Sequence, residues 1–118
     1  MNRCKGMQAE ELACNFLKRQ GLLVITKNYY CCFGEIDLIM KDKELLDFVE
    51  VRQRQSLQYG GAISSITSAK KSKLLKTSQH YLKQSKLFNS VPYRFDLVSI
   101  TGWDDNSLEW IKNAIYWE

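Results

Sequence analysis

A chain of 118 residues is long enough for one hydrophobic core and too short for two ordinary domains, so we expect a single domain over residues 1–118. Its 45% hydrophobic and 25% charged residues are typical of a globular protein and exclude a low-complexity or fibrous chain. The net charge of +4 makes the chain moderately basic, which suits a phosphate-bearing partner.

The first six residues lack the apolar core of a signal peptide, and no apolar run approaches the roughly 20 residues of a membrane span. We therefore expect a cytoplasmic protein with no membrane partner. The four cysteines show no CxxC spacing, and Cys31 and Cys32 are adjacent, so we interpret them as free thiols. His80 is the single histidine, so the chain lacks the histidines that a zinc cluster usually uses, and a histidine-dependent triad has only one candidate.

Residues 7–20 predict a helix, because apolar side chains recur there at helical spacing and Gly21 is a stop signal. At 100° per residue, Glu10 lies on the edge of the apolar stripe, whereas Glu11 points to the opposite side. Glu10 is therefore the acid of this helix that can face inward. The alternative is a carboxylate that the helix dipole favours near the helix start.

Residues 22–29 are rich in Val, Ile and aromatic side chains and predict a first strand. Two strongly apolar runs follow, residues 34–40 and 45–54, and a short charged break separates them. This pattern predicts a β-hairpin with a tight turn. Gly34 would allow a close backbone approach just before the acidic strand.

The predicted hairpin carries acids within both of its strands. Alternation divides the first run into a face with Glu35, Asp37 and Ile39 and an opposite face with Ile36, Leu38 and Met40. A loop of two or four residues gives an odd-sum register, which places Asp37 close to Phe48 and Glu50 on one face. Arg52 follows Glu50 on that face. A three-residue loop would break this convergence.

Two carboxylates on neighbouring strands repel each other and cost free energy to desolvate, so they imply a compensating cation. Arg52 or a metal ion could fill that role. Hard oxygen ligands with no nearby His or Cys spacing favour Mg²⁺ or Mn²⁺ over Zn²⁺. A salt-bridged hairpin face without further function is the alternative.

After this hairpin, residues 55–61 are polar and contain glycine, which predicts a loop in a position where loops often cover a site. Residues 64–84 predict a long helix with one face formed by Leu74, Leu75, Ser78, Tyr81 and Leu82. Residues 93–101 predict a further strand that contains Asp96. The apolar ending at residues 108–115 fits either a last strand or a helical turn.

The long predicted helix concentrates lysines, which form a usable phosphate-facing surface; a solvated helix face is the alternative. Lys73, Lys76 and Lys83 point away from its apolar face. Lys71 projects toward the middle of that face and Lys70 toward its margin, so at least one of them can reach back to the sheet. Snorkelling at the end of the stripe is the alternative for this pair.

In this order the features resemble the bacterial YraN family, and the resemblance covers nearly the whole chain. It is carried by Glu10, residues 34–37 (GEID), residues 48–54 (FVEVRQR), residues 59–61 (YGG), Lys70, residues 94–96 (RFD) and residues 110–114 (WIKNA). That family is similar to the PD-(D/E)xK nuclease superfamily, particularly the archaeal Holliday junction resolvases. The resemblance implies an α/β, restriction-endonuclease-like core with a mixed central sheet flanked by helices, in the order helix, three-strand meander, helix, strand.

By that resemblance, Asp37 matches the first metal-binding acid of the superfamily and Glu50 the second, while Glu10 matches the helix-borne acid of resolvase-like members. Arg52 stands at the position of the catalytic lysine. An arginine cannot act as a base there, although it can stabilise charge or bind a phosphate. Lys70, on the following helix, is the candidate to supply the missing amine.

The implied function is a Mg²⁺- or Mn²⁺-dependent endonuclease or phosphodiesterase that acts on DNA, including branched DNA, in repair or recombination. Asp37, Glu50 and Glu10 are expected to hold the metal. Four basic residues are expected to contact phosphates: Arg54, Lys70, Lys73 and Lys76. The alternative is a non-catalytic nucleic-acid-binding or adaptor protein on the same fold. RNA as the substrate and a homodimer stay open.

Overall fold

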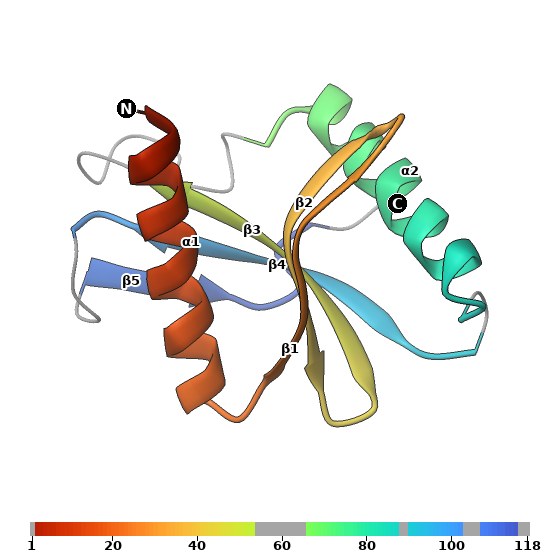
Figure 1. Ribbon diagram of the computed structural model, residues 1–118, viewed down its shortest axis with the longest axis horizontal. Coiled ribbons are helices and arrows are strands. Elements are labelled where there is room, and N and C mark those ends of the chain that lie inside the picture. Colours follow the sequence, from red (N-terminus) through yellow and green to blue (C-terminus); the bar gives the residue numbers. More distant parts are fainter. Residues whose placement is uncertain (1, 54–65, 88–89, 103–106, 116–118) are drawn as a thin grey trace.

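The computed structural model describes residues 2–53, 66–87, 90–102 and 107–115, with side chains described from Gln8 onward. The elements in these ranges are α1 (Asn2–Arg19), β1 (Leu23–Cys31), β2 (Gly34–Asp42), β3 (Leu45–Gln53), α2 (Ser68–Gln84), β4 (Tyr93–Ile100) and β5 (Leu108–Ile111) (Figure 1). The order expected from the sequence is therefore confirmed. Its ending, which the sequence left open, contains the short strand β5.

The described strands form one mixed sheet in the order β1-β2-β3-β4-β5. Neighbouring strands are antiparallel except for β3 and β4, which run parallel. Parallel strands need a long crossover connection, and the connection from β3 to β4 contains helix α2. The result is the α/β fold with a mixed central sheet that the sequence predicted.

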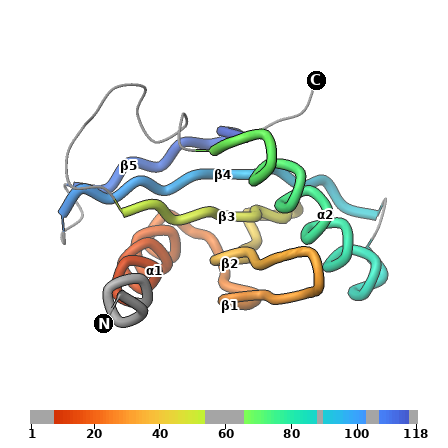
Figure 2. Tube along the Cα trace, turned by 90° about the horizontal axis from the view of Figure 1, so that it is seen from above, coloured from red at the N-terminus to blue at the C-terminus, as the bar shows by residue number. Residues whose placement is uncertain are grey.

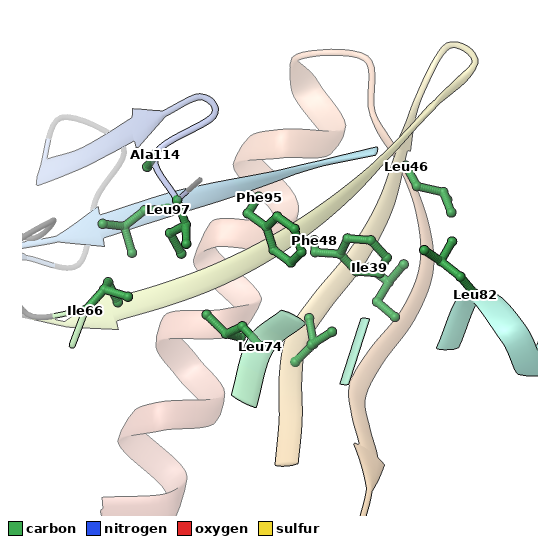
Figure 3. Packing of buried hydrophobic residues seen from close by; sticks show 11 residues of the cluster. Ile39, Leu46, Phe48, Ile66, Leu74, Leu82, Phe95, Leu97 and Ala114 are labelled. Atoms are coloured by element: carbon green, nitrogen blue, oxygen red, sulfur yellow. The ribbon is translucent and has the colours of Figure 1, made fainter. Parts of the chain in front are cut away.

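The two helices cover different faces of the sheet, because alternate residues of each central strand pack on different helices. The α2-side cluster includes Ile36, Ile39, Phe48, Leu74, Leu82, Phe95 and Leu97 (Figure 3). The α1-side cluster includes Ala13, Leu17, Leu38, Met40, Val49 and Val98. Figure 2 shows the strands between the two helices, with the β1–β2 turn beside α2.

The helix boundaries follow local signals in part. Helix α1 ends as predicted before Gly21, whose φ of 100° favours glycine. The helix begins at Asn2, five residues earlier than predicted, because apolar periodicity marks only its packed part. Helix α2 begins at Ser68, since the Thr67 hydroxyl caps it by accepting the Lys70 N–H at 3.2 Å.

The predicted hairpin register is confirmed. Strand β2 ends at Asp42 and β3 begins at Leu45, so the turn has two residues, and Lys43 adopts a φ of 58° there. Ile39 pairs with Phe48, which is the odd-sum register expected for such a turn. The acids of the two strands are thereby brought to the same region of the sheet.

A buried ion cluster holds β2, β3 and β4 together away from the predicted acids. The Arg94 guanidinium lies 3.0 Å from Asp42, 3.3 Å from Asp47 and 3.0 Å from Asp96. Burial and the neighbouring Asp96 raise the pKa of Asp47 to about 9. The Trp110 indole N–H donates to Asp96 at 2.9 Å, which adds β5 to the cluster. Asp96 is therefore a structural acid.

Three cysteines within the described side chains, Cys14, Cys31 and Cys32, are free thiols, as the sequence suggested. The side chain of Cys4 lies outside the described part. Neither helix of the described ranges is both long enough and apolar enough to cross a membrane.

Candidate functional site

Strands β2 and β3 separate at the two predicted acids. Their pairing runs from the turn as far as Leu38 and Val49, and beyond this point the strands diverge (Figure 1). Past the last pair, the Val51 N–H donates to Asp37 Oδ2 at 2.9 Å. The backbone N–H of Asp37 in turn donates to the Glu50 carboxylate. Both acids are therefore anchored to the backbone at the opening of a fork.

The fork corrects one detail of the predicted face pattern. Alternation places Ile36 with Leu38 and Met40, but Ile36 packs with Ile39 in the α2-side cluster. The face pattern therefore slips between Ile36 and Leu38, although the pairing with β1 stays in register there, since Ile36 pairs with Tyr29 and Leu38 with Lys27. The slip allows the Asp37 carboxyl to meet α1 while its backbone stays beside Glu50.

Glu10 is the acid of α1 that faces the sheet, as predicted. Its carboxyl interacts with Asp37 and with the side chain of Asn28. Asn28 adopts a φ of 53°, a conformation that asparagine tolerates better than most residues. Glu11 is exposed but pairs with Lys27 of β1 at 3.5 Å, so it lies at the flank of α1 rather than on the opposite side as predicted.

The three acids lie in surroundings that disfavour their charged forms. Burial and the Asp37 carboxylate raise the pKa of Glu10 to about 7. Burial and Asp37 likewise raise the pKa of Glu50 to about 8. Burial also raises the pKa of Asp37, although the Val51 N–H lowers it in part. The cluster therefore shares protons at neutral pH and would release them to a cation.

Arg52 is the cation on the strand that carries Glu50. Its Nη2 lies 3.6 Å from Glu50 Oε2, and it lowers the pKa of both Glu50 and Asp37 without cancelling their upward shifts. Its buried Nε has no hydrogen-bond partner within the described ranges. Arg52 is thus one of the two compensating cations that the sequence left open, and it compensates the acids only partly.

A cavity of about 130 Å³ opens between the fork and α2. It is lined by Gly34, Glu35, Glu50, Arg52, Lys70, Lys73 and Leu74. Gly34 permits the close approach of α2, since a Cβ there would lie 3.3 Å from Thr77 Oγ1. Two carboxyl groups, a guanidinium and two ammonium groups from α2 therefore surround one small space, which we call the fork pocket.

The lysines of α2 only partly match the prediction. Lys70 reaches the fork pocket, as expected, but Lys73 also lines it, although the sequence placed it away from the sheet. Lys71 does not line the pocket. The difference arises because the buried side of α2 includes Thr77 rather than Leu75, which turns the helix toward Lys73.

The remaining predicted residues lie apart from the acids or outside the described part. Lys76 is exposed and lines a second cavity with Phe33 and His80. Arg54 and the predicted loop at residues 55–61 lie outside the described residues. Sequence reasoning missed Glu35 as a lining residue, although it stands two positions before Asp37 within GEID.

The fit to a metal ion rests on two acids. No group of three or more His, Cys, Asp or Glu side chains within the described ranges is arranged to hold a metal ion. Mg²⁺ commonly takes only one or two carboxylates and completes its shell with waters and substrate phosphates. Asp37 and Glu50 beside a cationic pocket fit that mode of binding. Glu10 interacts with Asp37 from the side of α1.

Comparison with known proteins places the chain in a family. A family model described as "Uncharacterised protein family UPF0102" matches residues 9–100. A UPF0102 protein of Legionella pneumophila is 46% identical over 97% of this chain and 96% of its own length. A UPF0102 protein of Nitrosomonas europaea is 50% identical over 93% of this chain and 92% of its own length. One of Coxiella burnetii is 44% identical over 93% of this chain and 90% of its own length. This chain therefore belongs to the uncharacterised family UPF0102, which is the YraN family that its sequence resembles.

Proposed function

We propose that this protein is a metal-dependent phosphodiesterase that cuts DNA, with the fork of β2 and β3 as its catalytic site. The observation that supports this proposal most strongly is the meeting of Asp37 and Glu50. Both acids are anchored to the backbone and have raised pKa values, and Glu50 opens onto a pocket with three cationic side chains. Clustered acids with perturbed pKa values in a cleft are typical of catalytic sites.

Asp37 and Glu50 would hold Mg²⁺ or Mn²⁺, with Glu10 bound through a water. Such an ion supplies a bound water of lowered pKa and positive charge beside the scissile phosphate. The anchoring hydrogen bonds of Asp37 and Glu50 fix the two carboxylates before the substrate arrives, which favours a positioned attack. Lys70 and Lys73 would bind the phosphate from the side of α2.

Arg52 would stabilise the charge that develops on the phosphate oxygens. It lies beside Glu50 in the fork pocket, and its fixed charge excludes a role as a general base. We place the activity in DNA repair or recombination and expect branched DNA as a substrate, on the basis of the resemblance to Holliday junction resolvases. A non-catalytic nucleic-acid-binding protein is the second candidate, and the observation that favours it is this arginine at the lysine position.

The proposal is tested by the nicking of DNA flaps and four-way junctions in Mn²⁺. We expect slow nicking by the wild-type protein and a rate at least about tenfold higher for Arg52→Lys, because general base catalysis contributes roughly 10²–10⁴-fold where an amine is well placed. An unchanged rate for Arg52→Lys, together with an inactive Lys70→Ala, would assign the amine role to Lys70.

The second candidate replaces the proposal if neither wild type nor Arg52→Lys cuts DNA or RNA with any divalent metal. Binding must be measured separately, because both candidates bind nucleic acid. In both cases the affinity is expected to fall steeply with salt and to depend little on sequence.

A further inference from the structure

A second cavity lies along α2 beyond the fork pocket. It has a volume of about 230 Å³ and is lined by Phe33, Lys76, Gln79, His80 and Lys83. It shares no lining residue with the fork pocket, but the two are neighbours in the chain. Phe33 directly precedes Gly34 of the fork pocket, and Lys76 follows Lys73 by one turn of α2. We call this second cavity the aromatic pocket.

Phe33 is an unusual residue for a surface turn. The residue is 44% exposed and lies in the turn between strands β1 and β2. Figure 2 shows this turn beside α2. It touches His80 edge to face, with ring centroids 6.2 Å apart and an interplanar angle of 68°. Phe33 thus contacts His80 and still exposes aromatic surface at the pocket that it lines. Open aromatic surface in a basic groove is what binds unstacked nucleobases.

The opposite wall of the aromatic pocket is held in place by hydrogen bonds. The Tyr29 hydroxyl donates to Gln84 Oε1 at 2.9 Å and lies 2.7 Å from His80 Nδ1. These two contacts of the Tyr29 hydroxyl tie the His80 ring and the Gln84 amide to strand β1. Tyr81 packs edge to face on Tyr29 with centroids 5.2 Å apart. His80 therefore offers the pocket an oriented ring.

The charges along α2 connect the two pockets. Lys70 and Lys73 line the fork pocket, and Lys76 continues the same row at a spacing of three residues to the aromatic pocket. Such a row can follow successive phosphates of one strand. At about 230 Å³, the aromatic pocket is smaller than the roughly 300–1,000 Å³ of drug-sized sites, as expected for a single base.

We infer that the aromatic pocket binds one unpaired nucleobase, stacked on Phe33 beside His80, with Lys76 on the adjoining phosphate. The inference rests on the proposed function, because it takes nucleic acid as the ligand of the fork pocket. It also narrows the substrate class. A base inside a duplex has both faces covered by its neighbours, so the substrate carries a single-stranded segment beside the bond at the acids.

The test compares two labelled oligomers of equal length by fluorescence anisotropy in EDTA, so that nothing is cut. One is oligo-dT, and the other has the same sugar-phosphate chain without bases. Wild type is expected to bind oligo-dT more tightly. Phe33→Ala should lower its affinity for oligo-dT by about 5- to 100-fold, the range for a lost base–aromatic stack, and leave binding of the abasic chain within twofold.

Two further variants serve as controls. Lys76→Ala should weaken the binding of both oligomers alike, because it removes a phosphate contact. It should also reduce the slope of log affinity against log salt concentration by about 0.7. Tyr30→Ala should change neither affinity, since Tyr30 is 67% exposed on β1 and lines neither pocket. If Phe33→Ala does not fold, the wild-type comparison of the two oligomers still decides, with Phe33→Leu in place of alanine.

Equal wild-type affinity for oligo-dT and the abasic chain would overturn the inference. A Phe33→Ala variant that loses the same factor of affinity for both oligomers would overturn it as well. These outcomes leave the proposed function intact if the protein nicks DNA. Base-dependent binding by a protein that never nicks DNA would instead uphold the aromatic pocket and overturn the catalytic proposal. Absence of binding to any nucleic acid at low salt would overturn both.

Discussion

Replacing Glu50 by Gln is expected to lower the rate of Mn²⁺-dependent DNA nicking by about a thousandfold. The amide keeps the size of the side chain and can still accept the Asp37 N–H, but it removes one of the two charged ligands at the fork. A loss of this order is typical when one charge-stabilising group leaves a catalytic site. The rate is measured on supercoiled plasmid and on a four-way junction under single-turnover conditions.

Glu11→Gln is the matched control, because the same substitution there alters a surface acid that pairs only with Lys27 in the described contacts. It should nick at the wild-type rate. Circular dichroism and DNA affinity in EDTA should be unchanged in both variants. A Glu50→Gln protein that nicks DNA as fast as wild type would show that the cleavage does not arise at the fork.

The second large effect concerns stability. Arg94→Met is expected to lower the free energy of unfolding by about 3–5 kcal/mol, because it removes one partner of a buried ion cluster. Asp47 and Asp96 are fully buried, so their carboxyls cannot turn to solvent when the guanidinium is lost. Trp110 and β5 lose the fixed position of Asp96 as well. Urea denaturation followed by circular dichroism measures the change.

Lys41→Met provides the comparison, since Lys41 is exposed on β2 and the substitution also removes one positive charge. Its effect should stay within about 0.5 kcal/mol, as for most surface substitutions. A loss below about 1 kcal/mol for Arg94→Met would contradict the structural role given to the cluster.

The sequence predicted the parts of this site that depend on local rules. A two-residue turn sets the register of β2 and β3, and helical phase turns Glu10 inward, so both could be derived. It did not predict the slip at Asp37. At that slip the Val51 N–H donates to the side chain of Asp37, an interaction that no alternation pattern contains.

The errors on α2 have a different origin. Its buried face was predicted around Leu75 but includes Thr77, which lies against Gly34 of β2. The spacing of apolar residues in a helix shows which side chains share a face, whereas the rotation of that face over the sheet depends on tertiary packing. Lys73 therefore lines the fork pocket unexpectedly. The aromatic pocket was missed for the same reason, since it joins Phe33 to residues more than forty positions away.

The raised pKa values connect metal binding to pH. A carboxyl with a raised pKa in the folded protein binds a proton there that the unfolded chain has released, so the metal-free protein should lose stability as pH rises from about 4.5 to about 8. A metal ion must displace this proton from Glu50. Its stabilising effect should therefore be greater at pH 8 than at pH 6.

Thermal unfolding with and without Mn²⁺ tests the central claim most directly, because an ion that binds only the folded protein raises its melting temperature. At about ten times its Kd and pH 8, Mn²⁺ should stabilise wild type by about 1.4 kcal/mol, a rise of roughly 5 °C for a domain of this size. Asp37→Asn should abolish the rise, and Glu11→Gln should retain it. A wild-type transition that millimolar Mn²⁺ leaves unmoved, or an equal rise in Asp37→Asn, would contradict the assignment of the fork as a metal site.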